Sequence, residues 1–119
     1  MFHEHGDLRE RTTAFARCIA HAFRNLPNDR VARIWGEQLL RAAGSVGANC
    51  REAQRGRSTA EYRSKLGDCL READEALYWI DLLESEHLCP SLVCGPLKQE
   101  TSELVAIFVT LLRRHSDTS

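Results

Sequence analysis

The sequence predicts an all-α protein, an up-down-up-down four-helix bundle that forms a single domain over residues 1–119. Apolar residues recur at steps of three and four in four separate segments, which is the spacing of one helix face. No segment alternates apolar and polar residues with the Val, Ile and Thr content of a strand. The first two connections are short, so neighbouring helices run antiparallel. We expect short flexible termini at residues 1–6 and 116–119.

The first helix is expected to begin at Asp7, because Asp7 and Glu10 have the spacing of a capping box. Pro27 and Asn28 end it and begin a short connection. The residues that share its apolar face are Leu8, Thr12, Phe15, Ile19, Ala22, Phe23 and Leu26.

The second helix is expected from about Asp29 to about Gln54, although Gly36, Gly44 and Gly47 lie inside it. Each glycine costs about 1 kcal/mol relative to alanine in a helix interior. We expect close approach of another backbone to compensate where small residues gather, at Ala42, Ala43, Gly44, Ser45, Gly47 and Ala48. The alternative is a break between the last two glycines. The predicted apolar stripe is Val31, Trp35, Leu39, Ala42, Val46, Cys50 and Ala53.

A basic turn then leads into the third helix. Gly56 is available for a left-handed helix cap, and Ser58 with Glu61 forms a capping box. The helix is expected to end near Glu86. Its apolar stripe consists of Tyr62, Leu66, Cys69, Leu70, Ala73, Leu77, Ile80 and Leu83.

The fourth helix is expected from about Leu97 to about Arg114, or from Ser91 if it begins a turn earlier. Its middle, LVAIFVTLL, is apolar almost all round, which predicts a second buried side in an oligomer. Trp79 and Leu82 lie off the main stripe of the third helix and would share that interface. The alternative is a few scattered exposed apolar groups.

The five cysteines are an odd number, and the N-terminus lacks the pattern of a secretory signal, so we predict a cytoplasmic protein without disulfides. The sequence contains no apolar run that spans a membrane. Cys18, Cys50 and Cys69 fall at apolar helix positions and are predicted to lie in the core. We predict no metal site, because the remaining His and Cys residues lack a standard zinc spacing: His3, His5, His87, Cys89 and Cys94.

Positive charge is concentrated in one part of the chain. Residues 30–65 contain eight Lys or Arg and three Asp or Glu, whereas residues 66–119 contain four and ten. The second and third helices meet at a corner that is predicted to bind a phosphate backbone or a partner through Arg51, Arg55, Arg57, Arg63 and Lys65. The alternatives are a solvated corner, or one that meets an acidic helix of a neighbouring subunit.

The carboxylates and aromatic residues outside this corner are predicted to have structural roles. A di-iron bundle needs Glu-x-x-His on two helices, and the sequence contains no such motif. Nor does it contain a Gly-rich phosphate loop or a nucleophile elbow, so we predict no catalytic or cofactor-binding residue and no small-molecule substrate. We assign structural or interface roles to Asn49, Glu52, Glu75, Trp79, Ile107 and Phe108.

The chain resembles the 23S rRNA intervening-sequence protein family over nearly its whole length. The residues that carry this resemblance are Gln38, Arg41-Ala42-Ala43, Ser45-Val46, Asn49, Glu52, Ser58-x-x-Glu61-Tyr62, Leu66, Glu72-Ala73-x-Glu75, Tyr78-Trp79 and Glu103-Leu104-x-Ala106-Ile107-Phe108-Val109. The resemblance implies a bacterial four-helix bundle that assembles as a ring, typically a homopentamer, with a poorly defined molecular function. A related branch, the accessory protein of diversity-generating retroelements, binds nucleic acid.

Together these observations predict a non-catalytic oligomeric assembly protein. The alternative is a nucleic-acid-binding accessory factor of an rRNA insertion or mobile element, which would bind RNA or DNA through the basic corner.

Overall fold

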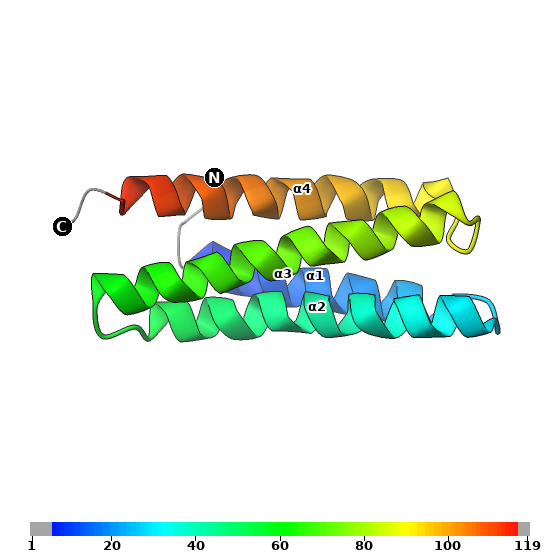
Figure 1. The fold of residues 1–119 in the computed structure, drawn as a ribbon, viewed down its shortest axis with the longest axis horizontal. Helices are drawn as coiled ribbons and strands as arrows, with labels where there is room; N and C mark the ends of the chain where they lie inside the picture. Colours follow the sequence, from blue (N-terminus) through cyan, green and yellow to red (C-terminus); the bar gives the residue numbers. More distant parts are fainter. Residues whose placement is uncertain (1–5, 117–119) are drawn as a thin grey trace.

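The computed structural model describes residues 6–116, with side chains from residue 8 onward. Four helices follow one another, α1 (Gly6–Arg24), α2 (Arg30–Gln54), α3 (Thr59–Ser85) and α4 (Ser91–Arg114). They run alternately up and down in an elongated bundle of 49 × 26 × 20 Å (Figure 1). α3 packs against both α2 and α4, whereas α1 packs mainly against α2. The predicted all-α four-helix fold is thus confirmed.

Polar side chains cap the starts of α2 and α3, and the cap at Ser58 is the one that the sequence predicts. The side chain of Asp29 accepts a hydrogen bond from the Ala32 N–H at 3.0 Å. Ser58 accepts one from the Glu61 N–H at 3.1 Å, and Glu61 in turn accepts from the Arg57 N–H at 2.9 Å. These bonds satisfy amide groups that have no partner within the helix. The expected cap at Asp7 and most of the expected flexible termini lie outside the described side chains, although Gly6 already belongs to α1.

The connection between α3 and α4 is shorter than the sequence indicated, because α4 begins at Ser91, the earlier of the two predicted starts. Pro96 therefore lies inside the helix, where it cannot donate the hydrogen bond that the Leu92 carbonyl would otherwise accept. α3 ends with His87 in the left-handed region, at φ 59°. The Leu88 N–H then donates to the Leu83 carbonyl at 2.9 Å, as in a Schellman motif.

The core follows the predicted stripes, with two exceptions. Val31 is 42% exposed, whereas its neighbour Ala32 is buried, so the buried face of α2 is rotated away from Val31 at its first turn. Cys18 is exposed, although Cys50 and Cys69 lie in the core as predicted. Periodicity alone does not show which flank of a stripe the neighbouring helices cover. Within residues 6–116, no helix has the length and apolar composition that would carry it across a bilayer.

The glycines of α2 differ from one another in how much space surrounds them. The helix is continuous, so the predicted alternative of a break is excluded. A Cβ atom at Gly36 would lie 2.7 Å from Leu26 Cδ1 and 2.8 Å from Phe23 Cδ1, whereas one at Gly44 would meet nothing within 4 Å. The tightest contact at these glycines is thus at Gly36, against side chains at the end of α1, whereas in the predicted cluster Ala42 and Ala43 are fully buried and Gly44 is exposed.

Gly56 does not form the left-handed cap that the sequence predicted. No glycine among the described residues has a positive φ, and α2 ends at Arg55 with φ −100° and ψ 8°. A Cβ atom at Gly56 would still lie only 3.1 Å from the Ala53 carbonyl oxygen and 3.2 Å from the Tyr62 nitrogen. A side chain at position 56 would be crowded by these backbone atoms, so this corner favours glycine.

Alanine substitutions at two glycines of α2 are expected to have opposite effects. Gly44→Ala should raise the free energy of unfolding by about 1 kcal/mol, because alanine is the better helix former and its methyl group is unobstructed. Gly36→Ala should lower it by about 1 kcal/mol, since crowding against the Phe23 ring outweighs that gain. Urea denaturation measures both. Equal stabilisation by the two substitutions would contradict the close approach at Gly36.

Candidate functional site

The up-down topology brings the corner between α2 and α3 to the same end of the bundle as the end of α4 (Figure 1). Two contacts join them: the Tyr62 and His115 rings lie 4.9 Å apart, and Arg63 donates to the Leu112 carbonyl at 3.0 Å. Arg113 and Arg114 in the last turn of α4 thus join the predicted basic residues. We call this set the basic end: Arg51, Arg55, Arg57, Arg63, Lys65, Arg113 and Arg114.

Three of the five predicted basic residues are exposed with unpaired guanidinium groups. Arg51, Arg55 and Arg57 lie on the last turn of α2 and in the turn that follows it. Within residues 8–116, no carboxylate forms an ion pair with any of the three. These side chains are therefore available to an anion from outside the chain.

The other two predicted residues are held by contacts within the bundle. Arg63 is half-buried and caps the C-terminus of α4 through the Leu112 carbonyl, where a cation is favourable. Lys65 Nζ lies 2.7 Å from Glu52 Oε1 and 4.0 Å from Asp68 Oδ2. The hydrogen bond to Glu52 raises the pKa of Lys65. Both residues therefore make contacts between helices, and Glu52 on α2 reaches α3 through Lys65.

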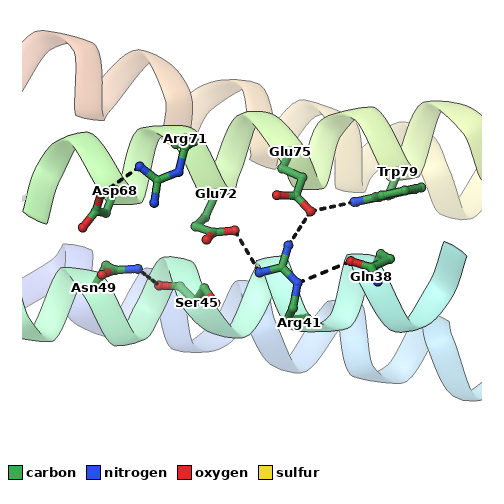
Figure 2. Close-up of polar contacts among 9 residues, drawn as sticks. All are labelled: Gln38, Arg41, Ser45, Asn49, Asp68, Arg71, Glu72, Glu75 and Trp79. Carbon is green, nitrogen blue, oxygen red and sulfur yellow. Dashed lines mark hydrogen bonds and ion pairs between the residues drawn. The ribbon is translucent and has the colours of Figure 1, made fainter. Parts of the chain in front are cut away.

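A second polar cluster lies on the face formed by α2 and α3, where Figure 2 shows Arg41 between two acidic side chains of α3. Arg41 donates to Glu72 Oε1 at 3.3 Å and makes a short ion pair with Glu75. Trp79 Nε1 donates to the same Glu75 oxygen at 3.0 Å. The bonds from Trp79 and Arg41 lower the pKa of Glu75. Glu75 thus bonds to Arg41 of α2 and to Trp79 of its own helix.

The remaining residues of the predicted structural set lie in different environments. Asn49 is half-buried, and its amide donates to the Ser45 carbonyl of its own helix at 2.9 Å (Figure 2). Trp79 and Ile107 are half-buried and pack against the edge of the core. Phe108 is fully buried, so it belongs to the core of its own chain and not to an outer face.

The apolar middle of α4 is covered more fully than the sequence indicated. Val105, Ile107 and Leu112 are half-buried against the core of the same bundle. The exposed apolar residues of α4 lie instead in its first turn, where Leu92 is 91% and Val93 40% exposed. Across the described part of the chain, the other large exposed apolar residues are Val31, Ile34 and Tyr78.

His87, Cys89 and Cys94, which lack a standard zinc spacing in the sequence, differ in their exposure to solvent. Cys89 and Cys94 lie in the core, and Cys94 Sγ is 3.6 Å from the Cys89 carbonyl oxygen, whereas His87 is exposed. Burial, together with Cys89, raises the pKa of the Cys94 thiol, which disfavours the thiolate that binds metal. Among the described residues, no three His, Cys, Asp or Glu side chains are grouped to hold a metal ion. His3 and His5 lie outside these residues.

Comparison with known proteins identifies one family. The model of the family described as 23S rRNA-intervening sequence protein matches residues 5–110. A crystal structure from Bacteroides thetaiotaomicron, a protein of unknown function from the S23 ribosomal protein family, is similar with a TM-score of 0.86 and 25% sequence identity. The similarity covers 93% of this chain and 99% of the other. None of the curated proteins compared matches this chain.

The Arg41–Glu75 pair is expected to couple α2 to α3 in a pH-dependent way. Because the pKa of Glu75 is lowered, the pair stabilises the fold above the ordinary carboxyl value of 4.5, and this contribution is lost as the pH falls through the lowered pKa. Both side chains are partly exposed, so the coupling at pH 7 should be below about 1 kcal/mol. A double-mutant cycle of Arg41→Gln and Glu75→Gln measures it by urea denaturation. A coupling that persists unchanged in acid would refute this role.

Proposed function

Because the chain belongs to the 23S rRNA-intervening sequence protein family, we propose that it is a non-catalytic protein that assembles with copies of itself. The proposed assembly is a ring of identical four-helix bundles, and the resemblance of the sequence implies five of them. Neither the family description nor the description of the similar structure names an enzymatic activity.

The observation that carries this proposal is the position of the exposed apolar side chains. Val31 and Ile34 lie in the first two turns of α2, and Leu92 and Val93 in the first turn of α4. Both helices begin at the end of the bundle opposite the basic end (Figure 1). Tyr78, in the second half of α3, is 56% exposed. Because α2 and α4 do not contact each other within residues 6–116, these side chains lie on separate faces of the bundle, and a ring needs two such faces, each of which meets a different neighbouring copy.

The neighbouring surface has the composition of an interface. Trp79 beside Tyr78 is half-buried, and their rings meet edge to face at 5.1 Å. Trp79 also donates to Glu75, which pairs with Arg41. Tyr, Trp and Arg are enriched where proteins bury surface against one another, and their bonds within the chain hold these side chains in place before association.

Charge introduced at the exposed apolar residues is expected to dissociate the assembly. Light scattering of the wild-type protein at micromolar concentration should give a multiple of the 13.5 kDa chain mass. Ile34→Glu with Leu92→Glu should reduce that mass to one chain, because a buried unpaired carboxylate opposes association. Ala60→Glu with Ser64→Glu, at two exposed residues near the start of α3, introduces the same two charges and should leave the mass unchanged. A wild-type monomer would refute the proposal.

A second proposal concerns the basic end, which would bind the phosphates of a nucleic acid. It is supported by the three unpaired guanidinium groups of Arg51, Arg55 and Arg57, beside which α4 places two further arginines. Arginine forms bidentate bonds with phosphate, and the release of counterions drives such binding. In a ring, every copy would contribute one basic end, so several weak sites would act on one strand.

Reversing two charges of the basic end is expected to weaken nucleic-acid binding. Arg55→Glu with Arg57→Glu should reduce affinity by at least about 10-fold at low salt and lower the slope of log K against log salt by about 1 for each arginine. Arg17→Glu with Arg30→Glu changes the net charge equally at exposed residues of α1 and the start of α2. Mobility-shift assays over a salt series compare the two variants. Equal losses in both variants, or no binding by the wild type, would exclude this role for the basic end.

A further inference from the structure

A hollow of about 400 Å³ lies at the basic end, where the last turn of α2, the first turn of α3 and the end of α4 meet. Its lining combines the rings of Tyr62 and His115 with the side chains of Arg57 and Thr59. The two rings are 4.9 Å apart at an interplanar angle of 75°. The volume is within the range of pockets that hold small organic groups, about 300–1,000 Å³.

The aromatic pair is held in place by the fold. Tyr62 belongs to the first turn of α3 and packs against the core, while its backbone N–H donates to the Ser58 carbonyl at 3.0 Å. His115 directly follows α4, whose end Arg63 fixes through Leu112. An aromatic ring from the first turn of α3 and one from the residue after α4 therefore meet beside the arginines of the basic end.

We propose that this hollow receives an unstacked base of a single-stranded nucleic acid, with the neighbouring phosphate bound by Arg57. The inference rests on the proposed binding of nucleic acid at the basic end and specifies the form of nucleic acid bound. Aromatic rings beside arginines are the combination that single-strand binders use, because every base has a face that stacks. A duplex keeps its bases stacked and paired, so it offers the hollow only its phosphates.

Abasic strands separate base binding from phosphate binding. Fluorescence anisotropy would compare three labelled RNAs of about 12 nucleotides, a length within the site sizes of single-strand binders: an intact strand, an abasic strand and a duplex. The wild-type protein should bind the intact strand about 10-fold more tightly than the abasic strand, since stacking is lost without bases. Tyr62→Leu and His115→Ala should each reduce this ratio toward one. His21→Ala removes an exposed imidazole in the last turn of α1, outside both proposed surfaces, and should preserve it.

The outcomes distinguish the inference from the proposed function. Equal affinity for intact and abasic strands, with both weakened by Arg55→Glu and Arg57→Glu, would overturn base binding while leaving phosphate binding in place. Absence of binding to all three RNAs at low salt would overturn both. Circular dichroism verifies that each variant is folded. If Tyr62→Leu does not fold, His115→Ala becomes the deciding variant, because His115 follows the last turn of α4, and an unchanged ratio in it would refute the role of the ring pair.

Discussion

The small side chains on the buried face of α2 set how closely the other helices approach it. Ala42, Ala43 and Ala53 are buried there, and Gly36 has no room for a Cβ atom beside Phe23 and Leu26. Close helix packing gives dispersion contacts that offset the poor helix propensity of glycine. It also brings the outer flanks of α2 and α3 within reach of each other, so that the Arg41–Glu75 and Lys65–Glu52 pairs form. The polar clusters on the surface thus depend on the small residues inside.

Much of this fold was predictable because its local signals agree with its tertiary contacts. Ser58 caps α3 in the structure as its sequence context indicates, and the periodic stripes form the core. The predictions that were wrong concern which side of a helix its neighbours cover, because the sequence of one helix does not show where the other helices pack. Val31 lies within the periodic pattern, yet no helix covers it, and Gly44 lies among small residues, yet on the exposed side of α2.

The candidate site was predicted in part, for a similar reason. Arg51, Arg55 and Arg57 are close in sequence, so their proximity needed no knowledge of the fold. The contribution of Arg113 and Arg114 depends on the antiparallel order of four helices, which returns α4 to the corner between α2 and α3. The partners that engage Arg63 and Lys65, a carbonyl at the end of α4 and a carboxylate on α2, emerge only from packing. Sequence alone therefore overstated how much of the basic corner is available to a ligand.

The separation of apolar and basic groups along the bundle connects the two proposed activities. The net charge of −1 alone would argue against a polyanionic ligand, but it averages an arginine-rich end with the acidic middle of α3 and α4. Screening limits the reach of exposed charges to roughly 8 Å at physiological salt, so a bound strand would respond to the local arginines. Association through the opposite half would leave these ends uncovered. A ring would then place several copies of the proposed site on one strand, so the proposed binding of nucleic acid would gain affinity from the proposed assembly.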